Sequence, residues 1–177
     1  TMELSYWLGQ LKKSAMKKFV NTGTTEEDIG YGALNLHEIF ELRRELIDTN
    51  DENTTYIALE HIEQGTGKLL GTGKASDAVS TKTKFQKGDI LFGKLRPYLK
   101  KYWLAEFDGV CSTEILVFKP NSACLPVYGF YIVQQQSFVD YAVQSSCGTK
   151  MPRTNWEKLS AYMVELPTLE EQQKAIT

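Results

Sequence analysis

The chain has 177 residues, of which 42% are hydrophobic and 24% charged, so it holds enough apolar side chains for one folded domain. Its formal net charge is −2 and it has no apolar run near the roughly 18–20 residues that cross a bilayer, so we expect a soluble, cytoplasmic protein. Three widely spaced cysteines and two histidines argue against a structural zinc site and indicate buried free thiols.

Two segments near the N-terminus have helical spacing of their apolar residues. Residues 3–20 form one such segment, with lysines on the opposite side, and a polar linker over 22–32 follows. In residues 33–42 the pattern recurs at Leu36, Ile39 and Phe40, with Asn35 in the position of an N-cap. We therefore predict a helix in each segment.

The middle of the chain is predicted to be rich in strands. Short apolar stretches alternate with Gly, Asp and Pro residues typical of turns, which indicates a mixed or antiparallel sheet. The stretches are residues 56–59, 85–88 leading into 89–92, 102–105, 107–110 and 114–118.

The last third of the chain returns to helices. Residues 126–143 mix aromatic side chains with glutamines, which favours one or two helices packed on the sheet. A strand over 163–166 then precedes a helix that Thr168 caps, with Glu171 as its capping-box partner. The first and last helices have no evident partner in the chain, so we expect them to belong to a longer protein or to pack on partner subunits.

Charge is unevenly distributed along the chain. Residues 26–63 contain eleven acidic residues and only two arginines, whereas residues 64–158 contain thirteen Lys and Arg against seven acids. A polyanion responds to the local field because salt confines charge interactions to about 10 Å. The basic part predicts a nucleic-acid surface, and solvated lysines on strand edges are the alternative.

The segment over residues 87–103 is the most informative. A strand that carries Ile90, Leu91 and Phe92 into the core delivers a loop of cations, which Pro97 stiffens. The guanidinium of Arg96 has the fork that matches guanine O6 and N7, whereas lysines suit phosphate oxygens better. Tyrosine can stack on a base or hydrogen-bond to it. The candidate DNA contacts here are Lys94, Arg96, Tyr98, Lys100 and Lys101.

Residues 145–156 form a second candidate DNA contact. They combine small hydroxyl side chains and a glycine with two cations in a loop that Pro152 stiffens. An ordinary connection between a helix and a strand is the alternative. The candidate residues are Thr149, Lys150 and Arg153.

The sequence holds no recognisable catalytic motif. Neither histidine has a serine or cysteine partner in a nucleophile elbow, and the glycines of residues 65–73 fit neither GxGxxG nor a P-loop. The acidic residues of the strand-rich region are scattered. We therefore predict a non-catalytic module with no metal or cofactor of its own.

Several motifs resemble one known family. The sequences GDILFGKLRPYL (88–99), GVCSTEILVF (109–118), SCGTKMPR (146–153) and LPTLEEQ (166–172) are similar to those of the specificity (S) subunit of type I restriction-modification systems. Residues 56–68 resemble the opening of one of its target-recognition domains. Residues 11–19 resemble the end of the long spacer helix that precedes such a domain.

The patterns and the resemblance together predict an α+β fold. We expect a twisted, mostly antiparallel sheet flanked by helices, of the DNA-methylase specificity domain type, with a helical arm at the N-terminus. The expected divisions are the end of a conserved spacer helix over 1–22, a target-recognition domain over 23–166 and the truncated start of the next conserved helix over 167–177.

The resemblance also implies a function and partners. The domain would read one half of a bipartite target in double-stranded DNA and direct adenine methylation and restriction by modification and restriction subunits. S-adenosylmethionine, ATP and Mg would be bound by those subunits, and self-association through the spacer helices is a further possibility. With one recognition domain, the chain is expected to be a half-length subunit or an excised domain.

Two other functions stay open. The chain could be the recognition fragment of a single-chain methyltransferase-nuclease, in which case it would methylate DNA. It could also be a subunit-interaction module whose helices carry the function, in which case the loop cations would be dispensable.

Overall fold

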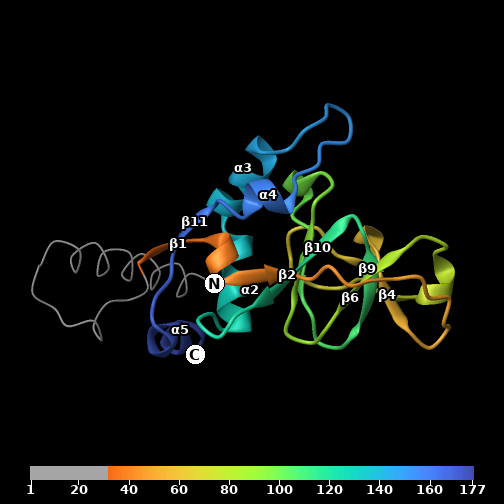
Figure 1. Ribbon diagram of the computed structural model, residues 1–177, viewed down its shortest axis with the longest axis horizontal. Coiled ribbons are helices and arrows are strands. Elements are labelled where there is room, and N and C mark those ends of the chain that lie inside the picture. The colour runs from red at the N-terminus through yellow and green to blue at the C-terminus, as the bar shows by residue number, and fades with distance from the viewer. Residues whose placement is uncertain (1–31) are drawn as a thin grey trace, which may run out of the picture.

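The computed structural model describes residues 32–177, which are arranged in three layers (Figure 1). A four-stranded sheet lies in the middle, with helices against one face and a five-stranded sheet on the other side. The middle sheet is covered on both faces because a hydrophobic core lies on each of them. This confirms the α+β class, although the strands form two main sheets where one was expected.

The middle sheet is antiparallel throughout. Its strand order is β2-β10-β7-β8. Successive side chains of a strand point to opposite faces, so Ile90 and Phe92 enter the core under the helices while Leu91 enters the core between the sheets. The predicted burial of all three is confirmed. The strands are β2 (Phe40–Leu42), β7 (Ile90–Gly93), β8 (Tyr102–Leu104) and β10 (Ile115–Pro120).

The outer sheet has the strand order β3-β6-β9-β4-β5, in which β4 and β9 are parallel and the other neighbours antiparallel. Phe85 of this sheet meets Trp103 of the middle sheet edge to face, with ring centroids 5.7 Å apart, and so joins the two layers. The strands are β3 (Leu46–Ile47), β4 (Thr55–Ile57), β5 (Gly73–Lys74), β6 (Lys82–Phe85) and β9 (Gly109–Ser112).

Helices cover the other face of the middle sheet, as predicted for residues 126–143. α2 (Pro126–Gln134) and α3 (Gln136–Gln144) are separated by Gln135, whose ψ of 137° is extended. Gly129 lets α2 approach the sheet, because a Cβ there would lie 2.8 Å from the Phe40 ring. A four-residue helix, α4 (Trp156–Leu159), begins at the N-cap Asn155.

The helix predicted over 33–42 is wrong. This segment forms β1 (Ala33–Asn35), a single 3-10 turn (Leu36–Glu38) and β2, and β1 pairs with β11 (Met163–Glu165). Leu36, Ile39 and Phe40 are buried, as their spacing indicated, but one turn suffices to bring them to the same side. The main-chain N–H of Asn35 donates to the Glu38 carboxylate over 2.7 Å. The other 3-10 turns are Leu59–His61, Ala75–Asp77 and Pro97–Leu99.

The last helix, α5 (Leu169–Ile176), begins with the predicted capping box of Thr168 and Glu171. It packs against α2, and Gln172 and Ala175 are buried there. The expectation that this helix finds no partner in the chain is therefore wrong. The helix predicted over 3–20, and with it the expected helical arm, lies outside the described residues, as does the linker up to Tyr31.

Candidate nucleic-acid interface

The two cation-rich segments of the sequence lie side by side. The first basic loop, residues 94–101, follows β7, and the second basic loop, residues 145–155, follows α3. The main-chain N–H of Arg96 donates to the carbonyl of Pro152 over 2.7 Å. The main-chain N–H of Thr154 donates to the carbonyl of Lys94 over 3.0 Å. Leu95 and Arg153 form an antiparallel bridge between these bonds. The second loop projects beyond α3 and α4, next to the first (Figure 1).

Arg153 is held at the base of the second loop by an ion pair. Its Nε and Nη2 donate to the two carboxylate oxygens of Glu114, each over 3.0 Å. The hydrogen bond and the negative charge of Glu114 both raise the pKa of Arg153. Because 44% of the Arg153 side chain is exposed, part of the guanidinium can still meet a ligand.

Arg96 contacts the second loop with both its main chain and its side chain. Its φ of 50° lies in the left-handed region, as does that of Lys100 at 52°, and the Pro97–Leu99 turn lies between them. Such residues cost about 1 kcal/mol or more each and persist where their surroundings fix them. Nη2 of Arg96 lies 3.3 Å from the carbonyl of Lys150, and its Nε is buried without a hydrogen-bond partner.

A third segment, residues 59–70, supports the first basic loop. Lys101 Nζ donates to the carbonyl of Leu59 over 2.8 Å, and Gly65 N–H donates to that of Lys100 over 2.9 Å. Gly67 has a φ of 76° and packs on Phe130, where a Cβ would lie 2.9 Å from the ring. In the sequence the glycines of this segment indicate only turns, and no local pattern marks the support that they give to the first basic loop.

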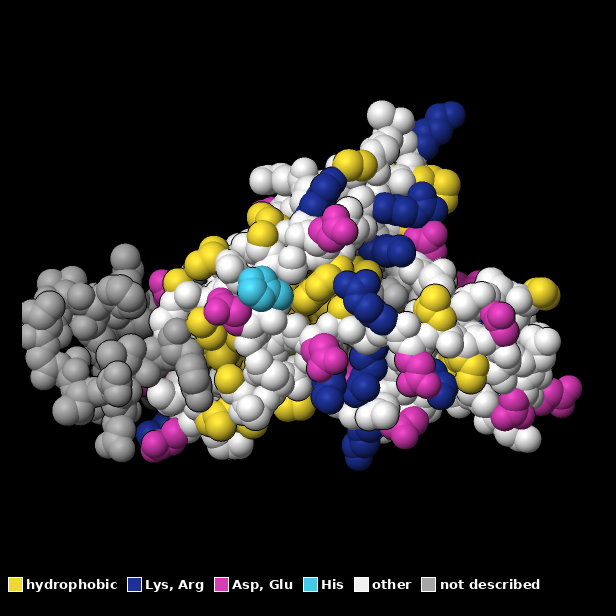
Figure 2. Space-filling view, in the orientation of Figure 1, with side chains coloured by type: hydrophobic (Ala, Val, Ile, Leu, Met, Phe, Trp, Pro, Cys, Tyr) yellow, Lys and Arg dark blue, Asp and Glu magenta, His cyan; other side chains and the backbone are white. Residues whose placement is uncertain are grey.

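The structure thus places all eight predicted contact residues on two adjoining loops. Thr149, Lys150 and Arg153 are exposed, Tyr98 is 48% exposed, and the rest are half-buried. Met151, which was not among the predicted contacts, is 46% exposed and lies between Lys150 and Arg153 in the chain. Cationic side chains occupy the tip of the projecting loop and continue in a band across this face of the molecule (Figure 2).

The base of the second loop is fixed by Lys158 of α4. Its Nζ donates to the carbonyl of Ser145 and to Cys147 Sγ, over 2.8 and 2.9 Å. Cys147 is exposed, so the prediction of buried thiols is correct for Cys111 and Cys124 and wrong here.

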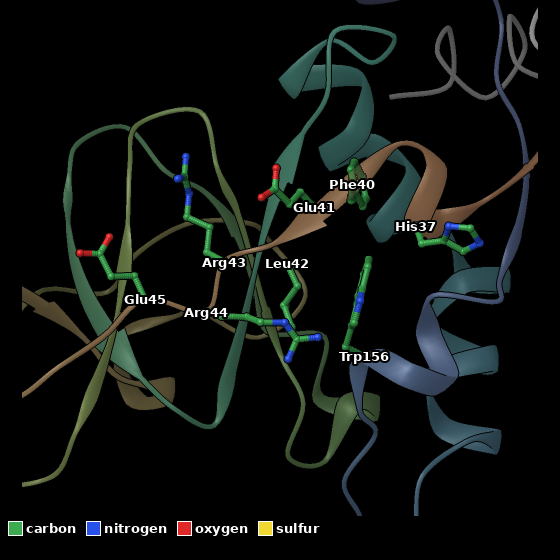
Figure 3. Close-up of a pocket in the computed structure, with 8 residues that line it drawn as sticks. All are labelled: His37, Phe40, Glu41, Leu42, Arg43, Arg44, Glu45 and Trp156. Carbon is green, nitrogen blue, oxygen red and sulfur yellow. The ribbon is translucent and has the colours of Figure 1, made fainter.

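A shallow groove of about 550 Å³ lies between β2 and α4 (Figure 3). Arg43 and Arg44 point in different directions from its floor: Arg43 pairs with the buried carboxylate of Asp89, whereas Arg44 is directed toward Trp156. Lys84 pairs with Glu45, so two charged residues of the groove, Arg43 and Glu45, are compensated by other protein groups. The lining residues are His37, Phe40, Glu41, Leu42, Arg43, Arg44, Glu45 and Trp156.

Residues 32–177 hold neither a cluster of metal-binding side chains nor a membrane-spanning helix. Within that range no three His, Cys, Asp or Glu side chains lie close enough together to hold a metal ion. In the same range no helix has the length and apolarity required to span a membrane.

Residues 29–177 match the family of the type I restriction modification DNA specificity domain. The chain belongs to this family. The specificity domain is 30% identical over 168 residues to the EcoDI specificity subunit of Escherichia coli, a match that covers 93% of this chain and 37% of that one. It is 29% identical over 102 residues to the HindI specificity subunit of Haemophilus influenzae, which covers 54% and 22% respectively. The chain thus spans well under half the length of these relatives.

Solved structures share the fold of the specificity domain. The HsdS subunit from Thermoanaerobacter tengcongensis matches with a TM-score of 0.68 and 23% identity, over 86% of this chain and 42% of that one. A chain from a study of complex assembly and conformational transition of the type I R-M system matches with a TM-score of 0.66 and 22% identity, over 82% and 40%. Specificity subunits are non-catalytic components of these systems, which agrees with the absence of a catalytic motif in the sequence.

Proposed function

We propose that the two basic loops are the surface with which this specificity domain reads one half of a bipartite DNA target. The observation that carries this proposal is the pairing of the loops: cations 54 positions apart in the chain share one surface because main-chain bonds join the loops. The proposed contact surface comprises Lys94, Arg96, Tyr98, Lys100, Lys101, Thr149, Lys150 and Arg153.

The exposure and chemistry of these side chains suggest which of them contact phosphates and which contact base edges. Lys150 and Arg153 are exposed cations and suit phosphate oxygens, which fix the position of a protein on the duplex. Thr149 and Tyr98 offer a hydroxyl and a ring for base edges. Lys101 adds positive charge while its ammonium group bonds to the carbonyl of Leu59.

The chemistry is proposed to belong to partners. In this arrangement modification subunits, which bind S-adenosylmethionine, methylate adenine at the site that the loops select. A restriction subunit, with ATP and Mg, acts on targets that are not methylated. The chain itself contributes recognition.

The decisive experiment exchanges this domain within an intact type I system and determines the methylated sequence in cells by methylome sequencing. We expect one half of the methylated motif to change and the other half to stay as before. An unchanged motif would contradict the proposal. Methylation by the isolated chain supplied with S-adenosylmethionine would instead favour the single-chain methyltransferase-nuclease.

A variant of the second loop tests the surface itself. Lys150→Ala should weaken binding of the assembled complex to all duplexes alike and lower the slope of log affinity against log salt by about 1, because one phosphate contact is lost. Lys119→Ala removes the same charge from an exposed position of β10 and is the matched control. Equal effects of the two variants would mean that Lys150 contributes only through the net charge.

A further inference from the structure

We infer that Arg96 is a positioning residue: its guanidinium holds the tip of the second basic loop against the first, so that the two loops meet DNA as one surface. The inference rests on the proposed function and assigns Arg96 a role within it. It differs from direct base reading, which the chemistry of an arginine fork predicts on its own.

One edge of the Arg96 guanidinium is turned toward the protein. A bidentate contact with guanine uses two N–H groups along one edge of the fork. In Arg96 the Nε end of the fork is buried and without a hydrogen-bond partner, and Nη2 lies 3.3 Å from the carbonyl of Lys150. The edge formed by Nε and Nη2 is therefore turned toward the protein and away from a ligand.

The side-chain hydrogen bond of Arg96 reaches the tip of the second basic loop. The base of the second loop is closed by Cys147 and Arg153, whose N–H groups donate to each other's carbonyls over 2.9 Å. Beyond these bonds the tip, residues 148–151, is exposed, and Gly148 has a φ of 106°. Among the residues that the structure describes, Arg96 supplies the side chain that hydrogen-bonds to this tip from outside the loop.

The consequence concerns the order of the tip before DNA arrives. Thr149 and Lys150 are proposed contacts, and an unordered tip would lose conformational entropy on binding. A bond to the Lys150 carbonyl fixes the main chain directly after these two residues while leaving both side chains exposed. Arg96 would therefore act on the base preference through Thr149, while the same ordered tip presents Lys150 to the phosphates.

Hydrogen exchange on the free chain tests the holding role without DNA. Arg96→Ala should raise the exchange of the Cys147 and Arg153 amides by about tenfold, which is the size expected when a charged group loses one hydrogen bond. Alanine keeps a Cβ, so the left-handed backbone of position 96 stays equally constrained. Lys94→Ala is the control, since it removes a cation of the same loop whose ammonium group makes no hydrogen bond in the described part of the chain. Unchanged exchange in Arg96→Ala would overturn the inference.

A double-mutant comparison on the assembled complex tests the route to base preference. Affinities for target and non-target duplexes are measured for Arg96→Ala, for Thr149→Ala with Lys150→Ala, and for all three changes together. If Arg96 acts through the tip, its change should lower discrimination about five- to tenfold in the natural chain and leave it unaltered once the tip side chains are gone. Additive losses would show that Arg96 reads its own base and would overturn the inference.

The two experiments fail in different ways. If the tip variant discriminates between duplexes as well as the natural chain does, the proposed contacts of the second loop are wrong, whatever the exchange rates show. If the tip variant loses discrimination but Arg96→Ala does not, the surface stands and the role of Arg96 falls.

Discussion

Lys82 is a lysine that the fold keeps almost completely from solvent. Only 1% of it is exposed, on β6 of the outer sheet. Its ammonium group donates to the carbonyls of Thr49, Ala78 and Ser80, over 3.1, 2.6 and 2.8 Å. These bonds satisfy all three N–H donors of the ammonium group and connect two loops to the sheet. Lys82 is therefore a structural cation, although it is one of the thirteen Lys and Arg residues of the basic range 64–158.

Replacing Lys82 should destabilise the chain without affecting the loops. Lys82→Met keeps the aliphatic stem but removes the donor of three carbonyls, so the free energy of unfolding should fall by about 3 kcal/mol. Lys84→Met is the matched control, because its ion pair with Glu45 is exposed and should contribute less than about 1 kcal/mol. Urea denaturation measures both values. Equal losses would mean that burial of the ammonium group is unimportant.

The buried thiol of Cys124 and the buried phenol of Tyr128 make the stability of the chain sensitive to high pH. Burial raises the pKa of Cys124 from 9.0 to about 12, and burial also raises the pKa of Tyr128 well above its ordinary 10.0. Both groups lie in the core between the helices and the middle sheet. In the unfolded chain they ionise at their ordinary values, so above pH 9 the unfolded state binds fewer protons than the folded state.

The free energy of unfolding should therefore fall as pH rises from about 9 toward 12. Each such group adds a slope of about 1.4 kcal/mol per pH unit within its own window. Cys124→Ala should be less stable than the natural chain at pH 7, because it loses buried sulfur, but its stability should decline less steeply above pH 9. Urea titrations at a series of pH values test this, and parallel curves for the two chains would contradict it.

At the scale of elements, α5 is joined to the domain by one buried glutamine. Gln172 Nε2 donates to the carbonyls of Ala123 and Pro167, each over 2.8 Å, and its Oε1 accepts from Leu125 N–H over 2.9 Å. A helix of eight residues is marginal by itself, so these bonds and the burial of Ala175 determine whether it stays folded.

Gln172→Leu should cost about 2–4 kcal/mol of unfolding free energy, because it fills similar space but leaves three buried or part-buried main-chain groups without this partner. Gln173→Leu changes the next residue, whose side chain is exposed, and should cost less than about 0.5 kcal/mol. Denaturation followed by circular dichroism compares them. Similar losses would mean that the side-chain bonds of Gln172 do not hold α5.

An element could be predicted from the sequence where a local pattern determines its structure. It could not be predicted where pairing with a distant segment determines that structure. The strands around Phe92 and Val117 and the cap at Thr168 follow from local patterns, and they are found close to where they were expected. Residues 33–35 and 40–42 become strands because β11 and β10 offer free edges, which are 75 or more residues away in the chain. The spacing of Leu36 and Ile39 fits one turn as well as a helix.

At the scale of the whole molecule, the division into two sheets had no signal in the sequence. Residues 90–92 and 115–118 are continuously apolar, which indicates burial on both faces but does not reveal what covers each face. The positions of the candidate contacts were predictable, since charge and turn residues marked both loops. Their pairing was not, because the bridge between Leu95 and Arg153 joins segments that are distant in the chain.

The balance of charge on the proposed surface can be altered through Glu114. Glu114→Gln removes the negative partner of Arg153, so binding to any duplex should strengthen about three- to tenfold at low salt, with a steeper salt dependence. Glu106→Gln removes the same charge from an exposed position and should have a smaller effect. Affinity measured over a salt series decides between them. Equal gains would mean that the pairing of Glu114 with Arg153 is irrelevant to binding.

The antiparallel ribbon of β1 and β11 has a consequence for modular exchange. Ala33 lies opposite Glu165, so the chain enters and leaves this part of the fold at neighbouring points, about 5 Å apart between Cα atoms. A cassette bounded by these two strands can be replaced by another of the same fold without changing the span that its flanking segments must bridge. Transplanting one loop alone would sever the bonds that join it to its neighbour. Recombination should therefore transmit a new specificity most easily as a complete cassette.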